Sequence, residues 1–308
     1  PRSFYPFDVL KSFKDGLDKR FDEFMRGELP VQKILSKPDD LAIYTLTSLL
    51  PKIPAFGSQD GMPLPVPGQL TSRSDMPLGA GMGSSAAVVA ATIVLYEHLL
   101  GRPQSIEDRF QKVRFCERLQ HGKGSAIDAS AVVFGGMNRV QGDDVRQLTL
   151  APDHSLARAD GWYWVLHGTP VSKTGECVAK VRAKHGANTG LWDEFTACTS
   201  AFERVIAEDG DPRDAIRENQ RLLDYIGVVP VPSARFVAAV EETGGAAKIS
   251  GAGAVAGDNG GAMVVYQPDH EAMVALMAKY PDRRWDRLQI AQDGARLMPA
   301  RPAMAAAQ

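Results

Sequence analysis

Apolar residues recur at helical spacing near the start of the chain. Leu10, Phe13, Leu17, Phe21 and Phe24 are separated by Lys and Asp, which predicts an amphipathic helix over residues 8–27. Further helices are predicted over residues 39–50, 86–100 and 105–120, and the last begins with a capping-box pattern at Ser105. The helix over 86–100 is almost wholly apolar, so we expect it to be buried. Pro and Gly predict a loop over residues 51–68.

The pattern changes in the second half of the chain, where strands and helices follow one another. Strands are predicted at 137–140, 145–150, 162–167, 262–266 and near 288, with another that enters a glycine loop within 246–253. Helices are predicted at 191–208, 212–225, 232–243 and 269–279. This order is typical of an α+β fold with a split βαβ, ferredoxin-like second half. The Ala- and Pro-rich tail after Met298 is predicted to be disordered.

Composition narrows the class of protein. A chain of 308 residues, 44% of them hydrophobic, can form one large domain or two ordinary ones around a real core. The net charge of -2 provides no basic field for nucleic acid or an anionic membrane. The three cysteines lack C-x-x-C spacing, and we find neither a signal peptide nor an apolar run that spans a bilayer. We therefore expect a cytoplasmic protein with no nucleic-acid or membrane partner. Its oligomeric state is left open, with a homodimer as one option.

A glycine-rich loop precedes the apolar helix. Residues 77–87 read P-L-G-A-G-M-G-S-S-A-A, in which three alternate glycines permit a tight turn and close approach to a ligand. The free N–H groups and the positive dipole end of the following helix suit a phosphate. The loop matches neither the dinucleotide fingerprint nor the P-loop. The alternative is a plain glycine turn before a core helix.

Two carboxylates downstream are candidates for chemistry. Glu117 falls within about 60° of Ile106, Phe110 and Val113 on the apolar stripe of its own helix. A carboxylate there needs a partner, which can be an arginine or a metal ion. Asp128 stands at the third position of a short predicted helix, where an ordinary role near the helix cap is an adequate alternative to catalysis.

Taken together, these motifs resemble those of the GHMP kinases, which comprise galacto-, homoserine, mevalonate and phosphomevalonate kinases. Residues 77–87 match the family loop P-x-G-x-G-[LM]-G-S-S-A-A. Residues 117–128, E-R-L-Q-H-G-K-G-S-A-I-D, hold their carboxylates eleven apart, as in the motif E-x-x-x-H-G-x-x-S-G-x-D of mevalonate kinases. Residues 167–174 and 218–228 also resemble family segments. Within the family, the chain is most similar to bacterial mevalonate kinases.

The resemblance implies a fold and an activity. The fold would be a two-domain GHMP kinase fold, with a ribosomal S5 domain 2-like ATP-binding domain over residues 1–155 and a ferredoxin-like domain over 156–308. The activity would be phosphorylation of the primary hydroxyl of mevalonate to 5-phosphomevalonate, with ATP and Mg²⁺ as cofactors. The alternatives are another small alcohol, such as phosphomevalonate or homoserine, and a non-catalytic relative.

The resemblance also implies roles for particular residues. Asp128 would accept the proton of the substrate hydroxyl, and Ser85 and Glu117 would bind Mg²⁺. Apart from the resemblance, Lys123 is a candidate for a cation that keeps Asp128 ionised. The remaining residues would contact ligands, with Gly79, Gly81, Met82, Gly83, Ser84 and Ser85 around the ATP phosphates and Thr174, Ser250, Gly251 and Ala252 around the substrate.

The chain departs from the family pattern at three places. The first family motif, K-x-x-L-x-G-E-H, is absent from the given residues. We therefore expect the first strands of the family fold to be missing here, and residues before Pro1 to exist in the working protein. Ser172 stands where the family has an arginine, two residues before Thr174. The third motif, within residues 250–261, carries an insertion in its glycine run.

Overall fold

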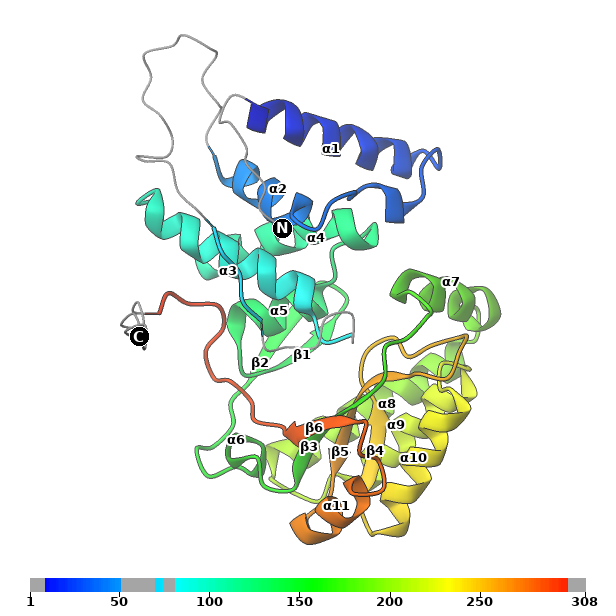
Figure 1. The fold of residues 1–308 in the computed structure, drawn as a ribbon. Helices are drawn as coiled ribbons and strands as arrows, with labels where there is room; N and C mark the ends of the chain where they lie inside the picture. The colour runs from blue at the N-terminus through cyan, green and yellow to red at the C-terminus, as the bar shows by residue number, and fades with distance from the viewer. Residues whose placement is uncertain (1–8, 51–69, 75–80, 299–308) are drawn as a thin grey trace, which may run out of the picture. The chain divides into compact units, whose positions relative to one another are not determined.

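The computed structural model describes residues 9–50, 70–74 and 81–298 (Figure 1). The chain divides into two compact units. The first comprises Pro1–Thr71, Ser85–Gly135 and Asp293–Gln308, and the second comprises Ser72–Ser84 and Gly136–Gln292. Each unit is made of segments that are not contiguous in the sequence, and their boundaries differ from residue 155. The division into sequence domains at residue 155 therefore stays a prediction.

The described part of the first unit is helical. Its elements are α1 (Leu10–Met25), the 3₁₀ helix η2 (Val31–Lys33), α2 (Asp40–Leu49), α3 (Ser84–Leu99), α4 (Ile106–His121) and α5 (Ala126–Phe134). The helices predicted over 8–27, 39–50, 86–100 and 105–120 are confirmed to within a few residues at each end. The predicted loop over 51–68 and the predicted tail after residue 298 lie outside the described residues.

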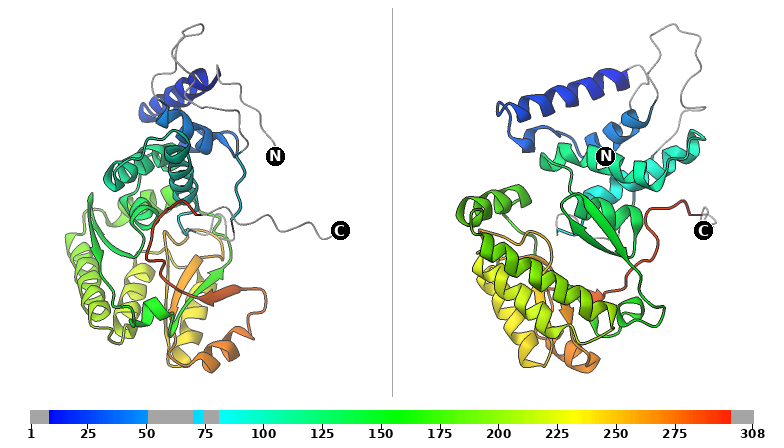
Figure 2. Two further views of the ribbon diagram at one scale, coloured as in Figure 1. Left: turned by 90° about the vertical axis from the view of Figure 1, so that its left-hand side faces the viewer. Right: turned by 180° about the vertical axis from the view of Figure 1, so that it is seen from behind.

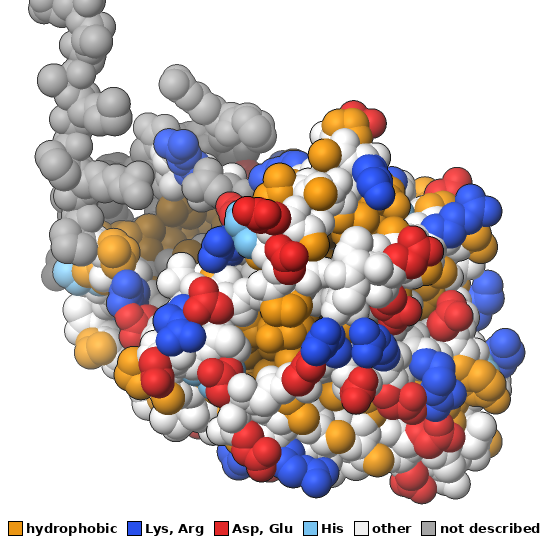
Figure 3. Space-filling model, turned by 90° about the horizontal axis from the view of Figure 1, so that it is seen from below, with side chains coloured by type: hydrophobic (Ala, Val, Ile, Leu, Met, Phe, Trp, Pro, Cys, Tyr) orange, Lys and Arg blue, Asp and Glu red, His pale blue; other side chains and the backbone are white. Residues whose placement is uncertain are grey.

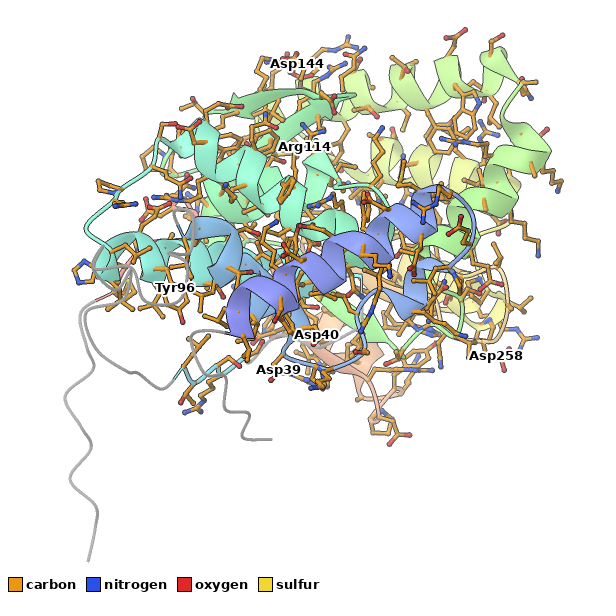
Figure 4. All side chains as sticks on the ribbon, turned by 90° about the horizontal axis from the view of Figure 1, so that it is seen from above. Asp39, Asp40, Tyr96, Arg114, Asp144 and Asp258 are labelled. Carbon is orange, nitrogen blue, oxygen red and sulfur yellow. The ribbon has the colours of Figure 1, made fainter. Side chains whose placement is uncertain are left out.

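Helices α1, α2 and α3 share a small apolar cluster. Leu10 of α1, Leu46 of α2 and Tyr96 of α3 are all buried in it. Figure 4 labels Tyr96 on α3 and Asp40 at the start of α2. The Asp40 carboxylate accepts hydrogen bonds from two backbone N–H groups of the preceding turn, at 2.7 and 2.9 Å, which fixes where α2 begins.

Both helices that carry the candidate carboxylates start at serine caps. The Ser105 hydroxyl accepts the backbone N–H of Asp108 at the start of α4, as the capping-box pattern predicts. Gly122 ends α4 with a φ of 78°, a left-handed conformation that favours glycine. The Ser125 hydroxyl then accepts the N–H of Ile127 and starts α5. These caps fix both ends of the short loop between Glu117 and Asp128.

The second unit contains two antiparallel sheets. Its elements are β1 (Met137–Gln141), β2 (Asp144–Leu148), α6 (Ser155–Arg158), β3 (Trp162–His167), α7 (Thr174–His185), α8 (Thr189–Ala207), α9 (Arg213–Tyr225), α10 (Val231–Glu242), β4 (Ala246–Ile249), β5 (Gly261–Tyr266), α11 (His270–Met277) and β6 (Arg284–Arg287). Strands β1 and β2 form a hairpin, and the larger sheet has the order β4-β5-β3-β6. That order is the expected ferredoxin-like arrangement, with β3 and β5 at its centre.

Helices cover both faces of the four-stranded sheet. Tyr163, Val165 and Met263 point to one face and pack with side chains of α10 and α11. Trp162 points to the other face and packs with Ile206 and with side chains of α8 and α9. Alternation along β3 therefore divides its residues between two cores. Figure 2 shows the backbone of this sheet and its helices in two further views. Helix α7 was not predicted, because of its residues only Cys177 and His185 are buried.

Charged side chains of both signs lie on the surface, whereas the cysteines are buried. Acidic and basic side chains are interspersed on the face shown in Figure 3. The three cysteines are free thiols and all are buried. Within the part of the chain that the structure describes, no helix has the length and apolar character needed to cross a bilayer.

Candidate active site

The candidate site begins with a contact between α3 and α4. The Ser85 hydroxyl, in the first turn of α3, donates a 2.9 Å hydrogen bond to Oε2 of Glu117, in the last turn of α4. The side chain of Glu117 is only 2% exposed. These two residues are 32 positions apart in sequence, and they are the pair for which the family resemblance implies a shared metal ion.

One oxygen of Glu117 is left without a protein partner. Oε1 is buried and accepts no hydrogen bond from the described residues. An ionised carboxylate in that position is costly unless a cation or a donor faces it. Among the described residues, no arginine is seen to pair with Glu117, which was one of the two alternatives from the sequence. Instead Nε2 of His121 lies 3.5 Å from Oε2, and the Glu117 hydrogen bond and charge raise the pKa of His121 against the opposing effect of burial.

Asp128 lies near this pair on the first turn of α5. Burial, and next the charge of Glu117, raise the pKa of the Asp128 carboxyl above its ordinary value, while His121 lowers it. The described residues give Asp128 no capping bond, because Ser125 caps the helix. His121, which sequence reasoning missed, is thus the side chain whose charge favours ionisation of Asp128. The role of Lys123 as a nearby cation stays a prediction. The spacing of four residues on α4 between Glu117 and His121 was the signal for this pair.

The first glycine loop is described from Gly81 onward, and Gly79 lies outside the described residues. Gly81 and Gly83 have φ angles of 77° and 69°, in the left-handed region. Met82 lies between these two glycines, and α3 begins directly after them at Ser84. The first N–H groups of that helix have no carbonyl partner within it, so they are free to bind an anion.

The second glycine loop meets the first. A Cβ on Gly251, whose φ is 86°, would lie 3.0 Å from the backbone oxygen of Gly81. A Cβ on Gly81 would lie 3.8 Å from the backbone oxygen of Ser250. The structure therefore brings Ser250 and Gly251, both predicted for the substrate, against the loop predicted for the nucleotide phosphates. Ala252 follows them in the same loop and is half-buried.

The start of α7 holds the second glycine loop. The buried Ser172 hydroxyl accepts the N–H of Val255 at 3.2 Å. The Cys177 thiol and the Lys180 amine reach the backbone oxygens of Gly253 and Val255, at 3.7 and 3.4 Å. Ser172, which replaces the arginine of the family pattern, thus anchors the inserted part of the loop. Thr174 is exposed at the first position of α7.

Among the described residues, no group of three or more His, Cys, Asp and Glu side chains is arranged to hold a metal ion. This does not conflict with a site for Mg²⁺ made from one hydroxyl and one carboxylate. Mg²⁺ is commonly held by one or two carboxylates together with waters and substrate phosphates. The unpartnered Oε1 of Glu117 is the feature that fits such a cation.

Comparison with known proteins shows a family similarity over the segment that carries this arrangement. Residues 50–136 match the family described as the GHMP kinases N terminal domain. Over these residues, the chain is similar to the GHMP kinases. The matched residues include the first glycine loop, Glu117 and Asp128, so the sequence resemblance and the family match rest on the same segment.

Individual proteins are similar to larger parts of the chain. It is 30% identical to the mevalonate kinase of Archaeoglobus fulgidus over 192 residues, which are 61% of this chain and 63% of that protein. The chain thus spans a little under two thirds of that relative. Its fold is similar to the mevalonate kinase of Methanococcus jannaschii, with a TM-score of 0.56, 20% identity and coverage of 70% and 65% of the two chains. It is equally similar to a homoserine kinase from Cytophaga hutchinsonii, with a TM-score of 0.56, 17% identity and coverage of 72% and 69%. These structures confirm the two-domain α+β GHMP kinase fold.

Proposed function

We propose that the protein is an ATP-dependent kinase that phosphorylates the primary hydroxyl of mevalonate, giving 5-phosphomevalonate and ADP. The Ser85–Glu117 contact at the start of α3 carries the proposal. It combines free helix N–H groups with a buried carboxylate, one oxygen of which has no partner among the described residues. Catalysis of phosphoryl transfer depends mainly on positioning and charge neutralisation. The Ser85–Glu117 contact can supply both positioning and charge neutralisation.

Ser85 and Glu117 are the residues we propose as protein ligands of Mg²⁺. When bound, the ion would neutralise negative charge on the phosphates of ATP. The Ser85 hydroxyl oxygen can face a cation while its proton is donated to Glu117. Glu117 supplies the negative charge, and its burial limits competition from bulk water.

The first glycine loop would bind the phosphates through its backbone. We propose that N–H groups from Gly81 to Ser85 donate to the phosphate oxygens, which the positive φ angles of Gly81 and Gly83 make sterically accessible. Gly79 and Met82 belong to the same proposed loop.

Asp128 is our proposed general base. Its carboxylate would accept the proton of the substrate hydroxyl and hold that oxygen toward the transferred phosphoryl group. The Glu117 charge works against ionisation of Asp128, and the His121 side chain works for it. His121 therefore helps to keep the base ionised, and a bound cation would act in the same sense.

The substrate would contact the second glycine loop and the start of α7. Thr174, Ser250, Gly251 and Ala252 are the residues proposed for it. We infer that the enzyme works in the cytoplasm on a small molecule. A homodimer remains an expectation that oligomer analysis can test.

An assay of ADP release across four alcohols tests the proposal. Purified protein would be supplied with ATP and Mg²⁺ and with mevalonate, phosphomevalonate, homoserine or galactose in turn. We expect turnover with mevalonate at a kcat/KM at least ~100-fold above the other three, since a site built to hydrogen-bond its substrate strongly rejects mismatched analogues. Preference for homoserine or phosphomevalonate would make the chain a GHMP kinase for another alcohol. No turnover with any of the four would favour a non-catalytic relative.

A further inference from the structure

A second polar contact joins α3 to α4 at the end remote from Ser85. The guanidinium of Arg109 donates two hydrogen bonds to the carboxylate of Glu97, from Nη2 at 2.6 Å and from Nε at 3.1 Å. The side chains of Glu97 and Arg109 are only 6% and 18% exposed. The two helices are thus joined at Ser85–Glu117 and at Glu97–Arg109, one contact near each end of α3.

Apolar packing alone defines the orientation of α3 weakly. Its inward residues include Ala86, Val89 and Ile93, but Val88 and Leu99 on other sides are also apolar although they are exposed. A helix that is apolar on most sides can bury several different faces at similar free energy. Hydrophobic contact therefore selects one rotation and one axial position of α3 only weakly.

The Ser85–Glu117 contact tolerates little movement of α3. A shift of one residue moves a helix by ~1.5 Å along its axis and turns it by ~100°. The 2.9 Å hydrogen bond between Ser85 and Glu117 would then exceed the distance at which such bonds exist. Something must hold α3 in register with α4.

We propose that Glu97 and Arg109 are a positioning pair that fixes α3 in register against α4 and thereby sets the Ser85–Glu117 contact. The planar, two-pronged bond between guanidinium and carboxylate has one preferred geometry, which apolar side chains lack. A buried ion pair often adds little net stability but can select one arrangement among several. The expected effect on Mg²⁺ binding rests on the proposed function, whereas the register of α3 against α4 does not.

The proposed register of α3 against α4 can be tested without metal ions and without an activity assay. The test measures the coupling free energy between the side chains of Ser85 and Glu117. Ser85→Ala, Glu117→Met and the double variant form a cycle in urea unfolding. In the otherwise natural chain we expect a coupling of about tenfold or more in the unfolding equilibrium constant, the range for a hydrogen bond to a charged group. In the E97M/R109M background, which removes both charges together, we expect this coupling to fall below about twofold.

Two further variants separate register from stability. Arg109→Lys keeps the charge but loses the two-pronged bond, so we expect partial loss of the coupling, and it serves if E97M/R109M does not fold. Leu17→Ala removes a buried α1 side chain that is 2% exposed, and it should lower stability while leaving the coupling at its natural value. Equal coupling in all backgrounds would overturn the proposal.

Mg²⁺ titration then tests the consequence. We expect the half-saturating Mg²⁺ concentration for ADP release to rise at least ~10-fold in E97M/R109M, as for loss of support around metal ligands, and to stay unchanged in Leu17→Ala. An unchanged value in E97M/R109M would contradict the link to the site. If the natural protein shows no Mg²⁺-dependent turnover, the proposed function fails, and the coupling cycle still decides the register.

Discussion

Replacing Glu117 by glutamine removes one negative charge from the candidate site and keeps the shape of the side chain. Even residues that only support metal ligands change affinity by roughly 10–100-fold when they are replaced. A direct charged ligand should matter more, so we expect the half-saturating Mg²⁺ concentration of Glu117→Gln to rise by ~100-fold or more. ADP release measured over a range of Mg²⁺ at fixed ATP gives this value.

The fold should survive the same substitution. In Glu117→Gln the new amide oxygen can still accept the Ser85 hydroxyl, although a neutral hydrogen bond is weaker by ~1 kcal/mol than one to a charged group. Relief from burying a carboxylate with an unpartnered oxygen offsets this loss. We therefore expect the free energy of unfolding to change by no more than ~1 kcal/mol.

A second readout reports the local geometry without any metal. Glu117 is the largest cause of the raised pKa of His121, so NMR titration of His121 in Glu117→Gln should show that pKa falling toward its ordinary value. Glu107→Gln, on the exposed first turn of the same helix, is the matched control and should change neither quantity. A Glu117→Gln variant with an unchanged Mg²⁺ dependence would refute the ligand role.

Three further predictions concern other parts of the molecule. Asp128→Asn should lower kcat by ~10² or more with a smaller change in KM, whereas a residue with only a capping role would cost about 1 kcal/mol of stability at nearly normal turnover; kcat and the thermal midpoint measured together discriminate these outcomes. Gly251→Ala should raise the KM for substrate and lower stability by more than Gly227→Ala, because both have positive φ but only Gly251 faces a backbone atom within 4 Å; steady-state kinetics and denaturant unfolding check this, and equal effects would argue against a tight contact between the glycine loops. Burial lowers the pKa of His167 to about 4 from 6.5, so its neutral form contributes stability that is fully present above pH 6.5 and is lost as the pH falls toward 4, by up to ~3 kcal/mol. The free energy of unfolding, measured over this pH range, should therefore depend less steeply on pH in His167→Asn. An identical slope would exclude His167 as the cause.

Local patterns predicted the elements that carry the candidate carboxylates. The capping box at Ser105 set the start of α4, and the apolar stripe correctly placed Glu117 on its buried side. These features depend on neighbours within a few residues, which is the range that periodicity and capping rules cover. The ferredoxin-like strand order was also confirmed. It could be predicted because the order of strands and helices along the chain strongly limits the arrangements of a sheet.

Contacts between distant segments could not be predicted in this way. The Ser85–Glu117 bond joins helices whose sequences carry no mutual signal, so only the family resemblance suggested the pair. Ser172 was recognised only as a departure from the family pattern, because its role depends on Val255, 83 residues away. Helix α7 was missed because most of its residues are exposed, and an exposed helix has little apolar periodicity.

Identification of the reaction product tests the central claim most directly. The protein would be incubated with ATP, Mg²⁺ and mevalonate, and the products followed by phosphorus NMR and mass spectrometry, with Asp128→Asn as a parallel sample. We predict one new phosphomonoester on the primary carbon of mevalonate, formed in step with ADP and at least ~100-fold more slowly by Asp128→Asn. Release of inorganic phosphate without a phosphorylated alcohol, or equal product formation by Asp128→Asn, would contradict the account.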